Sequence, residues 1–340
     1  MGLFSLFSRS KSVEPVDNRN LAERIGAKPS IRPRPTSFHV TLWPAFPHFE
    51  RFSRDNRIQG IRLNSAMMAA SEIDKDFERK IKSATVPLWF DIKGMQLRIR
   101  EIVCGDDCDH LEFKLNRPIE VDTPCTVYFK AGEDEAELLE IRNGNHLIFK
   151  RGPKYKVKPG ESIHIRQPGL KVLGPVFLDY EIEKISRVCS LGFTKFYLSY
   201  VYDQSHVDQF RQLIGPDSEL ILKIENREAL EWLKTGYKPQ LNTRLMTARG
   251  DLFVEVDYPH DILNATKFVV GKDPTAFVGS RMLLSCVNSS VPSCSDFSDL
   301  AWLYDIGYNN FLLCDELCLK ENLLARAVNA FDAFKKEYCA

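Results

Sequence analysis

The sequence alternates between short apolar runs typical of β-strands and longer stretches with helical spacing, and this alternation repeats eight times. The expected strands are residues 38–42, 57–63, 86–91, 195–200, 220–224, 245–248, 276–279 and 310–313. The clearest helical patterns cover residues 69–82, 181–191, 205–213, 227–234, 260–269, 295–304 and 320–336. Eight strand–helix units predict an α/β fold, a parallel (β/α)8 or TIM barrel, in which sites form at the carboxyl ends of the strands.

The alternation is interrupted after the third expected strand. Residues 99–174 contain short β patterns, such as 126–129, 146–149 and 162–165, separated by glycine-containing turns. We therefore expect a small all-β domain inserted into a barrel made of residues 37–98 and 175–340. Residues 1–36 are rich in Ser, Arg and Pro and are expected to be a flexible tail, whose role in targeting stays open.

Composition excludes several classes of function. The 340 residues include 46 basic and 46 acidic side chains, so the chain lacks the positive charge of a nucleic-acid-binding protein. No apolar run is long enough to span a membrane. We expect the nine cysteines to be reduced thiols of a cytoplasmic protein. The spacing of Cys104 with Cys108, and of Cys314 with Cys318, does not favour zinc because no histidine pair completes either set. A homo-oligomer is left open.

Three charged residues mark the ends of two neighbouring expected strands. Lys223 and Glu225 are two residues apart and therefore share one face of a strand. Asp251 follows the next apolar run, after Gly250, which permits a sharp turn or a close approach to a ligand. Two carboxylates at adjacent strand ends can hold a hard divalent cation, and the lysine can face an anion beside it.

These segments also carry a family resemblance. The stretch from Lys223 to Asn226, Lys-Ile-Glu-Asn, and the stretch from Ala248 to Leu252, Ala-Arg-Gly-Asp-Leu, resemble the metal and substrate core of pyruvate kinase. The resemblance implies that Glu225 and Asp251 ligate Mg²⁺ or Mn²⁺ and that the backbone at Arg249 and Gly250 faces the substrate carboxylate. It implies that Lys223 neutralises a transferring phosphoryl group or an enolate oxygen.

Other strand ends extend the resemblance. Arg62-Leu63-Asn64, and Asp91-Ile92-Lys93-Gly94 followed by Arg98, are similar to phosphate- and potassium-binding segments of the family. The resemblance implies that Arg62 and Arg98 hold phosphate and that Asn64 and Asp91 join a K⁺ site. It also implies that the Ser280 hydroxyl lies near the substrate methylene. The family carries a β-lid that is inserted at the same place as residues 99–174.

The sequence departs from the family at several of these positions. Ala66 and Ile92 lack hydroxyls expected at the K⁺ site, and Cys294 stands where the family has arginine. Arg281 replaces a glutamine, and Cys314-Asp315-Glu316 replaces Ser-Gly-Glu. The insertion is shorter than the family's lid and lacks its motifs. We therefore expect ADP or ATP to bind poorly and kinase turnover to be slow or absent.

Three functions fit these observations. The first is a pyruvate-kinase-like phosphotransferase that uses phosphoenolpyruvate and ADP. The second is a metal-enolate enzyme for other 2-oxo acids, of the aldolase or decarboxylase type, and the third is a 2-oxo-acid sensor without turnover. Because Lys223 lies at a strand end, we expect Lys223→Met to remove turnover with little change in melting temperature.

Overall fold

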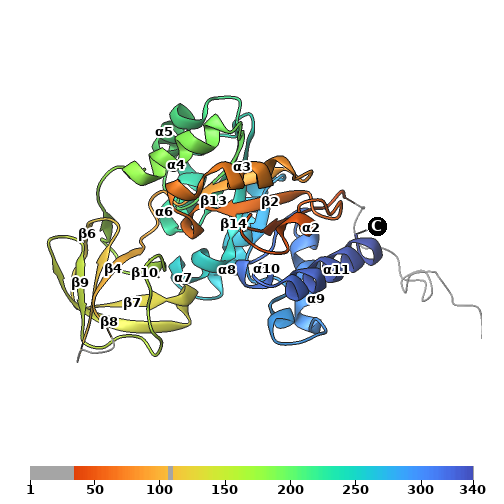
Figure 1. Cartoon of the computed structure of the whole chain (residues 1–340). Coiled ribbons are helices and arrows are strands. Elements are labelled where there is room, and N and C mark those ends of the chain that lie inside the picture. Colours follow the sequence, from red (N-terminus) through yellow and green to blue (C-terminus); the bar gives the residue numbers. More distant parts are fainter. Residues whose placement is uncertain (1–33, 106–109, 340) are drawn as a thin grey trace, which may run out of the picture.

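The computed structural model describes residues 34–105 and 110–339, so residues 1–33 of the expected tail lie outside the described residues. Eight parallel strands close into a barrel in the order β1-β16-β15-β14-β13-β12-β3-β2 (Figure 1). The expected mixed α/β fold with a closed eight-stranded parallel barrel is therefore confirmed. The strands are β1 (Ser37–Thr41), β2 (Gly60–Asn64), β3 (Leu88–Ile92), β12 (Lys195–Leu198), β13 (Glu219–Ile224), β14 (Thr243–Ala248), β15 (Phe277–Gly279) and β16 (Asn310–Leu312).

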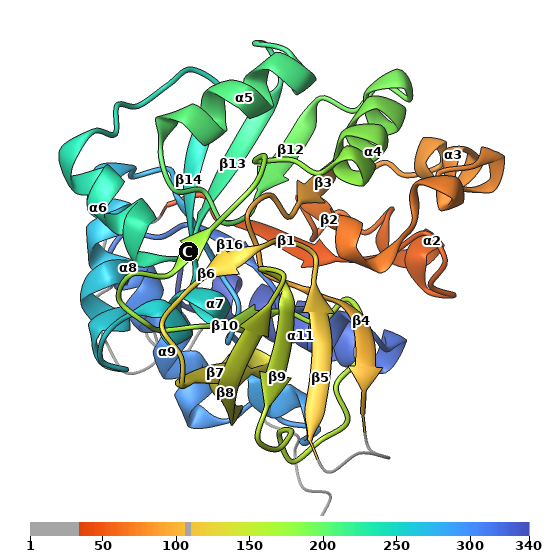
Figure 2. The ribbon, with the colours of Figure 1, turned by 90° about the vertical axis from the view of Figure 1, so that its left-hand side faces the viewer.

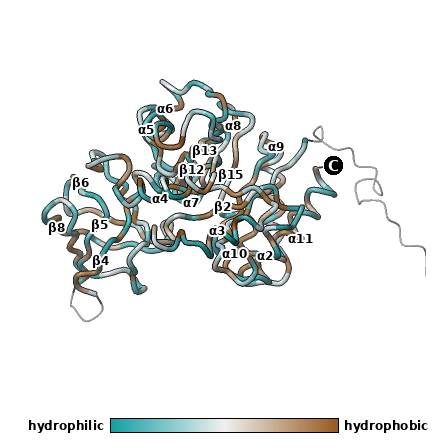
Figure 3. The backbone as a smooth tube through the Cα atoms, turned by 45° about the horizontal axis from the view of Figure 1, so that its top comes forward, coloured by the Kyte–Doolittle hydropathy of each residue, from teal (hydrophilic) through white to brown (hydrophobic). Residues whose placement is uncertain are grey.

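Alternation along the strands decides which side chains reach the site. In β13, Ile221 packs in the cluster that fills the barrel, whereas Leu220, Leu222 and Ile224 pack in the larger cluster outside it. Lys223 is two residues from Ile221 and therefore points to the inside, at the carboxyl end. Hydrophobic stretches gather along the barrel strands in Figure 3. The apolar pattern of this strand thus places a charged group over the barrel's interior.

Helices cover the outside of the barrel (Figure 2). Four of them begin at side chains that accept hydrogen bonds from the first turn, namely Asp74, Asp203, Asn226 and Ser293. The helices are α2 (Phe49–Phe52), α3 (Lys75–Lys82), α4 (Asp179–Ser190), α5 (Gln204–Ile214), α6 (Arg227–Thr235), α7 (Arg249–Glu255), α8 (Asp261–Lys272), α9 (Cys294–Asp305), α10 (Asp315–Cys318) and α11 (Glu321–Glu337). The short helix α7 was not expected, and it follows β14 directly.

The segment between β3 and β12 forms a second sheet in the order β10-β7-β8-β9-β5-β4, with antiparallel pairs. A cluster of apolar side chains that includes Phe113, Phe129 and Phe149 is packed within it. Two further short strands, β6 and β11, pair with each other. The strands are β4 (Ile99–Cys104), β5 (Leu111–Leu115), β6 (Ile119–Glu120), β7 (Cys125–Phe129), β8 (Asp134–Arg142), β9 (His146–Phe149), β10 (Ile163–His164) and β11 (Lys171–Val172).

Arg117 ties this second sheet to the barrel. Its side chain is fully buried, and Nη2 donates to the carbonyl oxygens of Gly94 at 2.8 Å and Val176 at 2.7 Å. Nη1 donates to the carbonyl oxygen of Pro175, and Nη2 lies 3.4 Å from Oε2 of Glu181. One guanidinium therefore holds both segments of chain that cross between the two sheets.

Two expectations from composition concern the redox state of the cysteines and the lack of a membrane-spanning segment. Within the described residues, seven cysteines carry free thiols, but Cys104 is disulfide-bonded. The expectation that all cysteines are reduced is therefore wrong for Cys104, while Cys108 lies outside the described residues. Among the helices of residues 34–105 and 110–339, none is both long and apolar enough to cross a membrane.

Candidate functional site

A cavity of about 690 Å³ lies between the carboxyl ends of the barrel strands and the second sheet. The volume suits a small-molecule ligand. Of the residues that the sequence singles out, Asp91 and Arg249 are not part of the lining. The others line it together: Arg62, Asn64, Arg98, Lys223, Glu225, Gly250, Asp251 and Ser280.

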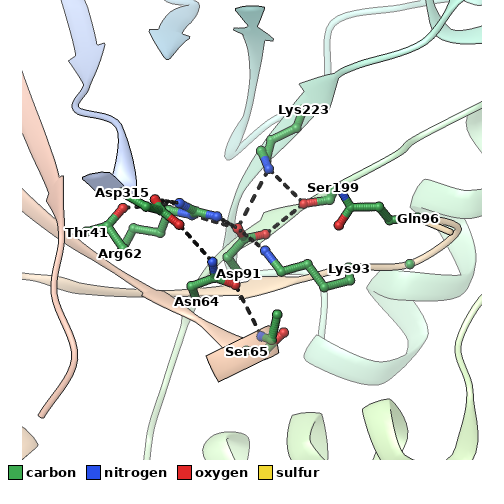
Figure 4. Close-up of polar contacts among 12 residues, drawn as sticks. Thr41, Arg62, Asn64, Ser65, Asp91, Lys93, Gln96, Ser199, Lys223 and Asp315 are labelled. Atoms are coloured by element: carbon green, nitrogen blue, oxygen red, sulfur yellow. Dashed lines mark hydrogen bonds and ion pairs between the residues drawn. The ribbon is translucent and has the colours of Figure 1, made fainter. Parts of the chain in front are cut away.

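Asp91 is the centre of a buried charge network at the end of β3 (Figure 4). Its Oδ2 accepts hydrogen bonds from Arg62 Nε at 2.6 Å and from Lys93 Nζ at 2.8 Å, and Lys223 Nζ lies 3.7 Å away. Its Oδ1 accepts one from Ser199 Oγ at 2.9 Å. Burial alone would raise the pKa of Asp91, but the three cations hold it well below its usual range. The protein's own donors thus cover this carboxylate.

Lys223 and Glu225 form an ion pair beside that network. Lys223 Nζ lies 2.8 Å from Glu225 Oε1 and donates to Ser199 Oγ at 2.8 Å. The backbone N–H of Tyr200 donates to Glu225 Oε2 at 2.8 Å, whereas the partner of Oε1 is the Lys223 ammonium. Burial raises the pKa of Glu225 to about 7, with Asp251 adding to the shift and Lys223 opposing it. Ionisation of Glu225 is thus disfavoured by burial and by Asp251, and Lys223 offsets only part of that effect.

Asp251 lies in the first turn of α7 and meets a histidine from the second sheet. His164 Nε2 lies 3.3 Å from Asp251 Oδ1, and its Nδ1 lies 2.8 Å from Glu255 Oε1 and 2.9 Å from the Tyr200 hydroxyl. Burial alone would lower the pKa of His164, but the hydrogen bonds and charges of Asp251 and Glu255 raise it to about 10. The same histidine lowers the pKa of Asp251 although burial opposes this. Sequence analysis missed His164, whose only signal is a polar residue inside the apolar run 163–165.

Asp315 is a second residue to which sequence analysis gave no role, and its carboxylate forms an ion pair with Arg62. Arg62 Nη1 lies 2.5 Å from Asp315 Oδ1 and donates to Thr41 Oγ1 at 3.1 Å, while Asn64 Nδ2 donates to Asp315 Oδ2 at 3.0 Å. Burial alone would lower the pKa of Arg62, but Asp315 and Asp91 raise it above its usual range. A carboxylate of the protein therefore lies where the resemblance implies that Arg62 holds phosphate. Its signal in the sequence was its place directly after the eighth strand.

The residues after β14 form the first turn of helix α7. The Arg249 side chain makes two hydrogen bonds of 2.7 Å with Asp299, so it points away from the cavity. Gly250 lies inside α7, so of the two roles that glycine permits there, the structure leaves the close approach to a ligand as a prediction. A Cβ atom at Gly250 would lie 3.3 Å from both Cβ and Oγ of Ser280, so glycine permits close packing of the two strand ends.

Arg98 lies at the side of the cavity next to the second sheet. It donates to Oε1 of Gln96 at 3.0 Å from Nε and to the carbonyl oxygen of Gly160. Burial lowers its pKa, although Asp251 opposes the shift from a distance. Its partners are neutral, so its charge is available to a ligand.

Within the described residues, no group of three or more His, Cys, Asp or Glu side chains has a metal-holding arrangement. A divalent ion at this site would therefore have two protein carboxylates, Glu225 and Asp251, with the remaining ligands supplied by water and substrate. The metal assignment thus depends on that pair alone.

The comparisons with known proteins agree with part of this picture. No family model matches the chain. A pyruvate kinase of Mycobacterium intracellulare is 28% identical to it over 143 residues, which are 40% of this chain and 30% of that protein. The chain thus covers less than a third of that relative's length, and the similarity supports a distant relationship to pyruvate kinase at most.

Proposed function

We propose that this protein binds a small 2-oxo acid together with a divalent cation and stabilises its enolate form, as a distant relative of pyruvate kinase. The observation that carries the proposal is the placement of Glu225, Asp251 and Lys223 in one cavity, at the ends of neighbouring strands of a closed barrel. In such barrels, this end of the strands is where active sites are built.

The two carboxylates suit a divalent cation on their own chemistry. Glu225 is fully buried, and burial and the charge of Asp251 raise its pKa to about 7 although Lys223 opposes the shift. A cation between the two carboxylates would relieve both costs, and oxygen ligands favour Mg²⁺ or Mn²⁺. The imidazolium of His164 already faces Asp251, so a metal would compete with it.

The residues around this pair have separate tasks in the proposed chemistry. A bound divalent cation would polarise the 2-oxo group. The Lys223 ammonium, held by Glu225 and Ser199, would stabilise negative charge on the enolate oxygen without having to reorganise. Ser280 would offer its hydroxyl at the same side of the cavity as Gly250.

Phosphoryl transfer between phosphoenolpyruvate and ADP is the second candidate, and the similarity to a pyruvate kinase favours it. The charge arrangement weighs against efficient transfer, because Asp315 already neutralises Arg62. Lys93 lies 2.8 Å from Asp91 and would compete with K⁺ at that carboxylate.

We further propose that residues 99–174 form a lid domain inserted in a barrel of residues 37–98 and 175–340. The second sheet and its own apolar cluster support this division. All four tryptophans lie in the barrel segments, so their fluorescence reports on the barrel alone. Loss of β-sheet circular dichroism before the fluorescence change during urea unfolding would support the division, and one shared transition would contradict it.

Two measurements on the purified chain test the proposed function. Calorimetry should detect Mn²⁺ binding, and proton NMR in D₂O should show metal-dependent exchange of the methyl protons of pyruvate. Asp251→Asn should lose both. Exchange no faster than in buffer with Mn²⁺ would refute the proposal, and rapid pyruvate formation from phosphoenolpyruvate and ADP would favour the kinase instead.

A further inference from the structure

Three cations in the outer part of the cavity have no carboxylate partner among the residues that the structure describes. They are Arg98, Lys130 and Arg281, and their contacts are with neutral oxygens and aromatic rings. No carboxylate within residues 34–105 and 110–339 lies at ion-pair distance from any of them. By contrast, the deeper cations Arg62 and Lys223 are each paired with carboxylates. We call Arg98, Lys130 and Arg281 the outer cations.

Arg281 is held in place by contacts that leave much of its guanidinium unused. The guanidinium lies 4.4 Å from the ring centroid of Phe253, and Nη2 donates to the carbonyl oxygen of Ala131 at 2.9 Å. Its Nε is buried without a partner among the described residues, and Glu133 acts on it only from beyond ion-pair distance. Arg281 and Ser280 both have left-handed backbones, with φ of 60° and 68°. Strained backbone that fixes a charged side chain is characteristic of functional sites.

The other two outer cations flank the same region. Lys130 Nζ lies 3.6 Å from the ring centroid of Tyr155, and the next residue, Ala131, receives the guanidinium hydrogen bond described above. Arg98 donates only to neutral acceptors, the side-chain oxygen of Gln96 and a backbone carbonyl. Lys130 is exposed, whereas Arg98 and Arg281 are partly buried. Partly buried cations without counter-ions are costly, and an anionic ligand group would offset that cost.

The outer cations adjoin the proposed metal pair. Ser280 packs against Gly250, which precedes Asp251, and Arg281 follows Ser280 directly. Asp251 favours the charged forms of Arg98 and Arg281 from a distance. A divalent cation on Asp251 would cancel that influence and leave both arginines uncompensated. The cavity of about 690 Å³ also has more room than a three-carbon acid fills.

We propose that the outer cations bind a second anionic group, a carboxylate or a phosphate, at the far end of a 2-oxo acid. The oxo end of this ligand lies at Glu225 and Asp251, so the inference rests on the proposed function and narrows its substrate class. Arg281 is the central residue of this anion subsite, because Phe253 and Ala131 hold its guanidinium and Nη1 makes no hydrogen bond with the described residues. Planar guanidinium groups recognise both carboxylate and phosphate through paired hydrogen bonds.

Calorimetry on the full chain with saturating Mn²⁺ tests the proposal with three ligands. Pyruvate has no second anion, 2-oxoglutarate has a distal carboxylate, and phosphohydroxypyruvate has a distal phosphate. We expect at least one of the two acids with a second anionic group to bind about tenfold or more tightly than pyruvate, because that group would gain a charge-assisted hydrogen bond. The preferred acid identifies the distal group.

Variants locate the effect. Arg281→Gln should remove the advantage of the dianionic acid while the Kd values of pyruvate and Mn²⁺ stay unchanged, and Arg281→Lys should keep part of it. Arg244→Gln, at the other end of the barrel, carries the same charge change and should behave as wild type. Equal affinity for all three ligands, or an unchanged preference in Arg281→Gln, overturns the inference.

Failure of the proposed function would be recognised separately. If Mn²⁺ or pyruvate does not bind, the metal and 2-oxo-acid assignment is wrong. Titration with succinate and with inorganic phosphate in the absence of metal then decides the anion subsite. Binding that is lost in Arg281→Gln supports the subsite, and no binding by wild type overturns it as well.

Discussion

Replacing Lys223 with methionine removes a cation from the centre of the buried charge network. Lys223 is 6% exposed, and Glu225 is fully buried with Lys223 Nζ 2.8 Å away. Without the lysine, Glu225 keeps the N–H of Tyr200 and faces the charge of Asp251. Removing one partner of a buried ion pair costs about 3–5 kcal/mol. We therefore expect a large loss of stability, which revises the small change expected from the strand-end position.

The size of the loss depends on pH, because Glu225 can bind a proton. In wild type the pKa of Glu225 rises from 4.5 in the unfolded chain to about 7. The stabilisation that comes from protonated Glu225 is fully present below the unfolded pKa and is lost as the pH rises through 7. Between pH 6 and 8 this lowers the free energy of unfolding by about 1.4 kcal/mol. In the variant we expect Glu225 to stay protonated up to pH 8. The loss over the same range then doubles to about 2.7 kcal/mol.

Urea unfolding at pH 6, 7 and 8, followed by tryptophan fluorescence in the presence of a chelator, measures both effects. Lys234→Met is the control, because the Lys234 side chain is 68% exposed beside Glu231, and it should change stability by less than about 0.5 kcal/mol. Adding Glu225→Gln to Lys223→Met should abolish the extra pH dependence. A loss below about 1 kcal/mol at pH 8, or an unchanged pH slope, would refute the reasoning.

Metal and phosphate binding should respond to single carboxylates. Asp251→Asn should abolish Mn²⁺ binding in calorimetry, while the exposed control Asp257→Asn should keep it; equal affinities would show that Asp251 is not a ligand. Mn²⁺ affinity should rise from pH 6 to 8, because the ion displaces the proton of Glu225, whose pKa is about 7. Below that pKa the rise should reach up to about tenfold per pH unit, and a flat profile would contradict this. Asp315→Asn should free Arg62 and tighten binding of phosphoenolpyruvate about tenfold with Mn²⁺ present. Glu316→Gln makes the same charge change in the same cavity and should not tighten binding. No gain in Asp315→Asn would mean that Arg62 is not a phosphate site.

The parts of the structure that follow from local periodicity could be predicted from the sequence. Alternation along a strand has a period of two, so Ile221, Lys223 and Glu225 had to share a direction once the strand was recognised. Parallel strands joined by helices bring all their carboxyl ends to one side of the barrel, which placed Asp251 near that pair. The barrel and the proximity of these residues therefore required no long-range information.

The parts that depend on contacts between distant segments could not be predicted. His164 meets Asp251 only because β10 of the second sheet packs against α7, a contact that no short motif encodes. Asp315 reaches Arg62 because barrel closure places β16 beside β1, and β1 beside β2. Gly250 lies within a helix because β14 passes directly into α7. The absence of a Cβ atom therefore serves close packing against Ser280 and not a turn.

The buried guanidinium of Arg117 determines how a ligand can enter. It donates to the carbonyl oxygens of Gly94 and Val176, on the two chain segments that join the barrel to the second sheet. Swinging the second sheet away would strip a fully buried cation of its acceptors, which is costly in a water-poor environment. We therefore expect the second sheet to stay in place beside the cavity, whose lining includes Lys130 and Arg281, while a ligand enters. Binding of the proposed ligand should therefore need no hinge movement between the barrel and the second sheet.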